Sequence, residues 1–224
     1  VDTSDEWIVQ RTGIRERRIA GDTETTVSMA VQAGREAMVH AGCAAAEISA
    51  VIVCTSTPDH TFPSVAAEVQ AALGIPPGPA FDLQAVCSGF VYGLTVADMF
   101  IRTGQARRVL LIGAEKFSSI LNWEDRTTCV LFGDGAGAAV LAADEETGIL
   151  STHLHADGGY KHLLYNPVGV SSGFKQNEPN CGVRVLMTGN EVFKVAVKTL
   201  DAVVEETLAA NGLDKGQIDW LIPH

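Results

Sequence analysis

The chain has 224 residues, of which 46% are hydrophobic, enough for one large domain or two small domains with an apolar core. Its formal net charge of −11 argues against a general nucleic-acid binder, because neutralising phosphates requires a basic face, and no apolar run approaches the roughly 20 residues of a membrane span. The five cysteines form no C-x-x-C pair, which argues against a zinc ribbon; they are Cys43, Cys54, Cys87, Cys129 and Cys181. Their odd count and irregular spacing argue against a disulfide scaffold and favour a reducing, cytoplasmic location.

Helical and strand-like patterns alternate along the first part of the chain. Helices show apolar side chains at i, i+3 and i+4 spacing, and buried strands show continuous β-branched runs. In chain order, we expect a helix at residues 25–42, a strand at 50–57, a helix at 64–73, a strand at 80–86, a helix at 88–103, and strands at 108–113 and 128–132. This order predicts a layered α/β fold with a largely parallel or mixed sheet.

The pattern begins again after a turn at residues 144–148. We expect a strand at 149–155, a long polar loop at 161–183, an amphipathic helix at 190–210 and a strand at 219–222. The sequence therefore predicts two halves, residues 1–149 and 150–224. The start at Val1 without a methionine and the abrupt end at His224 indicate a fragment.

Cys87 lies where a predicted strand runs into a predicted helix, in AFDLQAVCSGFVYGL. A helix N-terminus favours a thiolate through its free N–H groups and dipole, and the same N–H groups can bind an oxyanion. This is the arrangement of a nucleophile elbow. A small buried side chain packed between strand and helix is an equally supported interpretation. Cys54 and Cys129 lie in apolar runs typical of a core, whereas Cys43 and Cys181 lie in loops.

Five stretches together resemble the β-ketoacyl-acyl-carrier-protein synthase III family of thiolase-superfamily condensing enzymes. They are TSDEWIVQRTGIRERR, AFDLQAVCSGF, FGDGAGAAVL, MTGNEVFK and DWLIPH, in the order and at the spacing of that family. The resemblance implies a thiolase-like fold of two related βαβαβ halves in a layered α/β/α/β/α arrangement, with the second half truncated. Relative to that pattern, the opening strand before Val1 and everything after His224 are absent.

The resemblance also implies a reaction. Cys87 and His224 match two members of a Cys-His-Asn triad, and the asparagine would lie beyond this chain. Cys87 would take an acyl group from an acyl-coenzyme A as a thioester, and the resemblance implies acetyl-coenzyme A as the donor. The enzyme would then condense it with malonyl-acyl carrier protein, with loss of carbon dioxide. The product, a 3-oxoacyl-acyl carrier protein, initiates fatty acid biosynthesis, and no cofactor is needed because the coenzyme A thioester is a substrate.

Trp7 lies close to an arginine-rich run, and an aromatic face beside a guanidinium is suited to clamping an adenine. By resemblance, the coenzyme A site comprises Thr3, Trp7, Arg11, Arg126, Asn190 and Phe193. Lys194 would contact the acidic carrier protein, and Phe62 would reach across a homodimer interface into the partner's acyl pocket.

Two other patterns are set aside. Residues 132–137, FGDGAG, resemble a dinucleotide-binding fingerprint, but Asp134 would point a carboxylate at a pyrophosphate, and glycines that permit close packing are the preferred interpretation. His153 and His155 alternate as two metal ligands do, but no third ligand lies nearby in the sequence, so we expect no metal.

The main alternatives are another Cys-His-Asn condensing enzyme, of polyketide or quinolone type, and a non-catalytic partner subunit. Non-catalytic partners of such enzymes lack the nucleophile, and Cys87 is present. The opening TSDEW…RTGIRERR and the GNEVFK stretch favour the fatty-acid initiator. We expect the 224-residue chain on its own not to catalyse condensation, because the asparagine is not in it.

Overall fold

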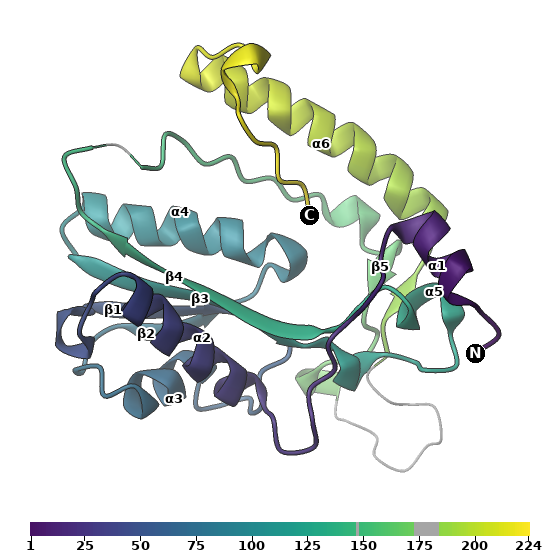
Figure 1. Cartoon of the computed structure of the whole chain (residues 1–224), viewed down its shortest axis with the longest axis horizontal. Coiled ribbons are helices and arrows are strands. Elements are labelled where there is room, and N and C mark those ends of the chain that lie inside the picture. The colour runs from purple at the N-terminus through teal and green to yellow at the C-terminus, as the bar shows by residue number, and fades with distance from the viewer. Residues whose placement is uncertain (147, 173–183) are drawn as a thin grey trace. The chain divides into compact units, whose positions relative to one another are not determined.

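A computed structural model describes residues 1–146, 148–172 and 184–224; Cys181 and part of the predicted polar loop lie outside these ranges. The residues group into two compact units (Figure 1). One unit comprises Val1–Arg17, Phe117–Gly133 and His153–His224, and the other, called here the sheet unit, comprises Arg18–Lys116 and Asp134–Thr152. The boundary between residues 149 and 150 concerns the two related halves and stays a prediction.

The sheet unit is built on four strands, β1 (Ala50–Cys54), β2 (Ala80–Leu83), β3 (Arg108–Lys116) and β4 (Asp134–Ala142). Their order is β2-β1-β3-β4. The first three run parallel, with Cys54 paired to Leu83 on one side and to Gly113 on the other, and β4 runs antiparallel to β3. The predicted mixed sheet is therefore confirmed.

Helices cover both faces of this sheet (Figure 1). They are α2 (Thr26–His40), α3 (Val65–Ala72) and α4 (Gly89–Arg102). Alternate strand residues point to opposite faces, so Val51 and Val53 pack with α2 and α3, whereas Ile52 packs with α4. Because both faces are covered, β1 is buried along its whole length, as its unbroken apolar sequence predicts.

The other unit contains α1 (Asp5–Thr12), α5 (Arg126–Cys129), α6 (Gly189–Asn211) and the two-residue strands β5 (Leu164–Tyr165) and β6 (Leu186–Met187). Short 3-10 turns complete the chain: Ala45–Glu47, Val86–Ser88, Phe117–Ile120, Gly158–Tyr160, Val170–Ser172 and Lys215–Gln217. Among the helices of the described ranges, none is long and apolar enough to cross a bilayer.

The prediction of a strand at residues 128–132 is wrong, because no strand forms there. Asp125 accepts a hydrogen bond from the Thr127 N–H and begins the helical turn α5. The guanidinium of Arg17 donates to the carbonyls of Cys129 and Phe132, at 2.6 Å for Phe132, so these carbonyls are satisfied without a neighbouring strand.

The strands predicted at residues 149–155 and 219–222 are also not formed, since these stretches pair with no strand in the described part of the chain. Several elements were not predicted. Among them, helix α1 is short and mostly polar, β4 is built largely from glycine and alanine, and β5 and β6 have only two residues each.

The close-packing role expected for the glycines of FGDGAG does not hold for Gly135 and Gly137. A methyl group at either position would meet no atom within 4 Å among the residues described. Both glycines lie in β4, not in a strand-to-helix turn, which supports the rejection of a dinucleotide-binding loop.

Candidate active site

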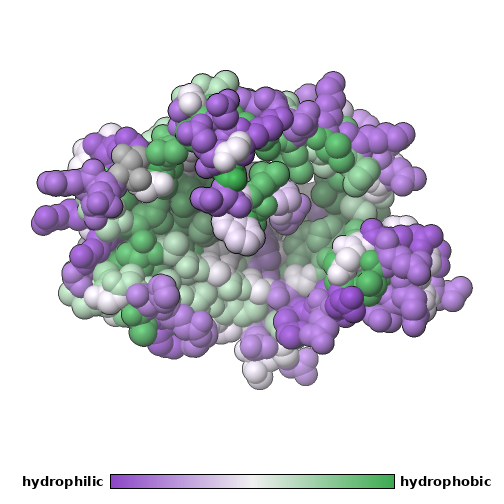
Figure 2. All heavy atoms as spheres, turned by 45° about the horizontal axis from the view of Figure 1, so that its top comes forward, coloured by the Kyte–Doolittle hydropathy of each residue, from purple (hydrophilic) through white to green (hydrophobic). Residues whose placement is uncertain are grey.

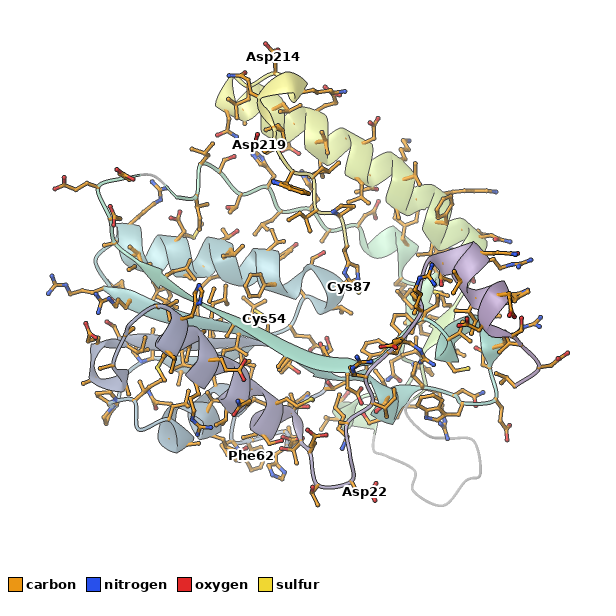
Figure 3. The ribbon with its side chains drawn as sticks, in the orientation of Figure 1. Asp22, Cys54, Phe62, Cys87, Asp214 and Asp219 are labelled. Carbon is orange, nitrogen blue, oxygen red and sulfur yellow. The ribbon has the colours of Figure 1, made fainter. Side chains whose placement is uncertain are left out.

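Cys87 lies in the turn between β2 and α4 (Figure 3). The 3-10 turn Val86–Ser88 occupies this position, and Val86 has φ = 48°, in the left-handed region that a β-branched residue rarely adopts. Such strain persists only where surrounding contacts enforce it, and it is common at functional sites. The predicted nucleophile elbow is therefore formed, and Cys87 is exposed at its tip, not packed as a core side chain.

The elbow is held directly against the last residue of β1. A methyl group at Gly89 would lie 3.3 Å from Cβ of Cys54, and one at Gly93 would lie 2.6 Å from Sγ of Cys54. Only glycine allows the first turns of α4 to approach the sheet this closely. The position of Cys87 is thus tied to the carboxyl end of β1.

The thiol of Cys87 is not biased toward thiolate in this chain. Solvent reaches the side chain, but the surrounding protein removes enough water to raise its pKa, and the carboxylate of Glu115 raises it further, whereas its own backbone N–H acts in the opposite direction. This differs from the expected effect of the helix N-terminus, because α4 begins two residues later, at Gly89.

The other cysteines of the described ranges are poorer candidates for a nucleophile. Burial is the main reason that the pKa of Cys54 rises to about 11. Cys129 is buried as well, and Cys43 is half-buried. Among the four described cysteines, Cys87 alone is exposed, which favours it over the others as the residue that reacts.

Trp7, Arg11 and Arg126 come together in the unit that contains α1 and α5. The guanidinium carbon of Arg11 lies 4.4 Å from the centre of the Trp7 ring, and that of Arg126 lies 4.9 Å from it. Arg126 also donates a hydrogen bond of 2.7 Å to the carbonyl of Asp2. An aromatic ring with two cations beside it offers both a stacking surface and charge for phosphates.

Thr3 belongs to the same segment and carries an unusual hydroxyl. Its Oγ1 is buried, and no hydrogen-bond partner for it exists among the residues described. A buried hydroxyl without a partner costs free energy unless a ligand or water satisfies it. The opening segment therefore presents a stacking ring, two guanidinium groups and an available hydroxyl.

Three further predicted residues lie at the start of α6. Asn190, Phe193 and Lys194 are all exposed there, with 70% of the Phe193 surface accessible. Figure 2 shows other apolar side chains at the surface of the molecule, in green. Large exposed apolar residues on α4 and α6 are Phe90, Val91, Met99, Phe193, Val197 and Leu200.

Phe62 and His224 are exposed as well. Phe62 lies in the loop before α3 (Figure 3), with 83% of its surface accessible, and His224 is the last residue of the chain. Their roles, and those of Asn190, Phe193 and Lys194, stay predictions.

His153 and His155 share one partner on α6. Nδ1 of His153 lies 3.2 Å from one carboxylate oxygen of Glu206, and Nε2 of His155 lies 2.6 Å from the other. The bonds with His155 and then His153 lower the pKa of Glu206. Since the two imidazoles bind this carboxylate directly, we interpret the three residues as a hydrogen-bonded cluster that fastens residues 153–155 to α6.

Glu115, near the end of β3, was not singled out from the sequence. The predicted strand ended at Gly113, so Glu115 fell outside it as an ordinary polar residue. In the structure its carboxylate is bound by two groups of the loop that follows β1, and burial is the main reason that its pKa is raised. A carboxylate following a long buried strand is the only signal that the sequence offered.

Residues 81–158, which include the elbow and β4, match the family of 3-oxoacyl-[acyl-carrier-protein] synthase III. A β-ketoacyl-acyl-carrier-protein synthase III of Xanthomonas campestris is 62% identical over 224 residues, which are 100% of this chain and 69% of the relative. One from Thioalkalivibrio sulfidiphilus is 57% identical over 225 residues, again 100% of this chain and 69% of the relative.

Solved structures of the same enzyme superpose on the chain. The one from Aquifex aeolicus gives a TM-score of 0.88 at 46% identity, and covers 97% of this chain and 66% of that one. The one from Pseudomonas aeruginosa gives 0.87 at 39% identity, with 97% and 65% covered. The chain spans about two thirds of the length of these relatives.

The identity over the whole chain distinguishes between the alternatives left open by the elbow alone. Its thiolase-like fold is common to condensing enzymes of several kinds, but the high identity is to the enzymes named above. This chain belongs to the β-ketoacyl-acyl-carrier-protein synthase III family of acyl-transferring condensing enzymes.

Proposed function

We propose that Cys87 of this chain accepts an acyl group from an acyl-coenzyme A bound beside Trp7, for condensation with malonyl-acyl carrier protein. The family condenses these two substrates to a 3-oxoacyl-acyl carrier protein and so initiates fatty acid synthesis. The observation that carries the proposal for this chain is the exposed cysteine at a strained elbow, in a protein whose other described cysteines are buried or half-buried.

The first step is transfer of the acyl group between two sulfur atoms. Sγ of Cys87 loses its proton, attacks the thioester carbonyl carbon, and forms a tetrahedral oxyanion. Backbone N–H groups at the start of α4 are suited to bind that oxyanion. Collapse breaks the bond to coenzyme A, which leaves as a thiolate and takes up a proton. Because the pKa of Cys87 is raised, removal of its proton adds to the free energy that this step requires.

The second step concerns residues whose roles come from the resemblance. His224 would donate a hydrogen bond to the enolate oxygen that develops as malonyl-acyl carrier protein loses carbon dioxide. The resulting carbanion equivalent attacks the acyl carbon of the Cys87 thioester, the carbon–sulfur bond breaks, and Cys87 leaves as a thiolate that takes up a proton. Lys194, an exposed cation near the start of α6, would meet the acidic carrier protein.

The coenzyme A site that we propose rests on the cluster of Trp7, Arg11 and Arg126. The adenine would stack on the indole ring, and the guanidinium groups would pair with phosphates. The buried hydroxyl of Thr3 would take a hydrogen bond from or to the ligand. Asn190 and Phe193 complete the set by resemblance.

The accompanying proposals have narrower support. The exposure of Phe62 suits a residue that enters a second subunit, so we propose a homodimer. The free cysteines suit a reducing cytoplasm. We propose no cofactor beyond the coenzyme A thioester substrate and no metal. The net charge of −11 supports the absence of a nucleic-acid partner, and we propose that the protein does not act on membranes.

Replacing Arg126 with alanine should weaken coenzyme A binding about ten- to a hundred-fold, the effect of losing one charge-assisted contact of ~1.5–3 kcal/mol. Titration calorimetry with coenzyme A measures this directly. Arg35→Ala is the matched control, since Arg35 is a surface arginine on α2 bonded to Gln32. Equal affinities for the two variants would remove the proposed site.

A further inference from the structure

Three chain segments of the sheet unit lie together at one end of its sheet. Strands β1, β2 and β3 are parallel neighbours, so their carboxyl ends lie together. The loop of residues 55–64 follows β1, the Cys87 elbow follows β2, and Glu115 lies near the end of β3. The topology therefore brings a half-buried carboxylate, a long loop and the proposed nucleophile to the same end of the sheet.

The carboxylate of Glu115 fastens the beginning of this loop. The Ser56 N–H donates to Oε1 at 2.7 Å, and the Thr57 hydroxyl donates to Oε2. The same hydroxyl accepts from the Lys116 N–H at 2.9 Å. Both carboxylate oxygens are thus used to hold the loop against the end of β3.

Other bonds fix the rest of the loop. The Thr26 hydroxyl donates to the Thr57 carbonyl at 2.7 Å, and the Asp59 carboxylate accepts from the Thr26 and Val27 N–H groups at the start of α2. Asp82 of β2 accepts from the first two N–H groups of α3, each at 2.8 Å. Between these anchors, Phe62 is exposed.

The anchored loop continues from the residue on which the elbow packs. Cys54 ends β1 and lies directly beneath Gly89 and Gly93 of α4. Thr55 then donates its N–H to the Leu83 carbonyl at the end of β2, just before the elbow. A displacement of the loop at Ser56 and Thr57 would therefore be transmitted through Thr55 and Cys54 to the contacts that hold Cys87 in place.

We infer that Glu115 is a positioning residue for Cys87, which holds the carboxyl end of β1 and its loop so that the thiol can accept the acyl group. The inference rests on the proposed function, in which Cys87 is the acyl acceptor. Glu115 acts through Ser56 and Thr57 and through its charge, which disfavours a second negative charge on Cys87. A purely structural carboxylate would affect stability without changing the chemistry of the thiol.

Two substitutions separate the charge from the bonds. Glu115→Gln removes the charge but keeps groups that can bond Ser56 and Thr57, whereas Glu115→Ala removes both. Thr57→Val removes the two bonds of the hydroxyl, with Glu115 and with the Lys116 N–H, and leaves the Glu115 charge, and it serves if Glu115→Ala fails to fold. Glu47→Gln is the control, because Glu47 pairs with Arg108 at the opposite end of β3. Circular dichroism reports whether each variant is folded.

The first readout is the rate of Cys87 alkylation by iodoacetamide against pH, followed on the Cys87 peptide by mass spectrometry. An ordinary cysteine has its midpoint near pH 8.5. The midpoint of the wild type should lie above this value, because the pKa of Cys87 is raised. Removing the Glu115 charge favours the thiolate, so Glu115→Gln should move the midpoint to lower pH. Glu47→Gln should leave it unchanged.

The second readout is the rate at which acetyl-coenzyme A acetylates Cys87. Glu115→Ala should acetylate at least about tenfold more slowly than the wild type, Thr57→Val should also be slower, and Glu115→Gln should stay within about threefold. The inference would be overturned if the alkylation midpoint of Glu115→Gln did not shift. It would also be overturned if Thr57→Val and any folded Glu115→Ala were acetylated at the wild-type rate. If wild-type Cys87 is not acetylated, the proposed function fails, while the alkylation profile still reports on Glu115.

Discussion

Replacing Cys87 with alanine should lower incorporation of the acetyl group from acetyl-coenzyme A by more than about 10³-fold. The substitution removes the sulfur that forms the thioester, and the buried thiols of Cys54 and Cys129 cannot replace it. The pKa of Cys54 is raised to about 11, so almost none of it is thiolate at neutral pH. Incorporation is measured by intact-protein mass spectrometry.

Two controls make this experiment specific. Cys43→Ser changes a half-buried loop thiol outside the elbow and should acetylate like the wild type. Coenzyme A affinity of Cys87→Ala should also match the wild type, since Trp7, Arg11 and Arg126 are untouched. Substantial acetylation of Cys87→Ala would show that another group is the acyl acceptor.

Replacing Ile52 with alanine should lower the free energy of unfolding by about 2–5 kcal/mol, the usual cost of a large cavity in a packed core. Ile52 is fully buried at the centre of β1, on the face that packs against α4. Since α4 begins just after Cys87, this core also supports the elbow. Urea unfolding followed by circular dichroism measures the change.

The matched comparison is Val39→Ala. Val39 lies on α2 with 76% of its surface exposed, and its truncation should change the free energy of unfolding by no more than about 0.5 kcal/mol. Ile52→Val should fall between the two, at about 0.5–1.5 kcal/mol. If Ile52→Ala were as mild as Val39→Ala, β1 would not be the centre of the core.

The elements predicted correctly are those whose burial follows from a long local pattern of apolar residues. The run AVIVC is buried on both faces, and Ser64 and Thr25 accept the hydrogen bonds that begin α3 and α2. Strand β4 was missed because its glycines and alanines carry little β propensity, and it forms through nine-residue pairing with β3. That pairing depends on residues far away in the sequence.

In the site, too, the features that depend on local sequence were predicted, and those that depend on distant residues were not. The position of Cys87 between strand and helix follows from local sequence, and the elbow is confirmed. The sequence places Trp7 close to the run that contains Arg11, but the contact of Arg126 with the same ring, from more than 100 residues away, was expected only from the resemblance. Neither the backbone strain at Val86 nor the bonds of Glu115 with Ser56 and Thr57 has a signature in the sequence, since both arise where separate strands end together.

The central claim is that Cys87 is the residue that carries the acyl group. The chain is incubated with acetyl-coenzyme A, digested, and mapped by tandem mass spectrometry under conditions that preserve thioesters. We predict that the added acetyl mass lies on the peptide containing Cys87 and is lost on treatment with hydroxylamine, as a thioester is. Acetyl mass on Cys54 or Cys129, with Cys87 unmodified, would contradict the account.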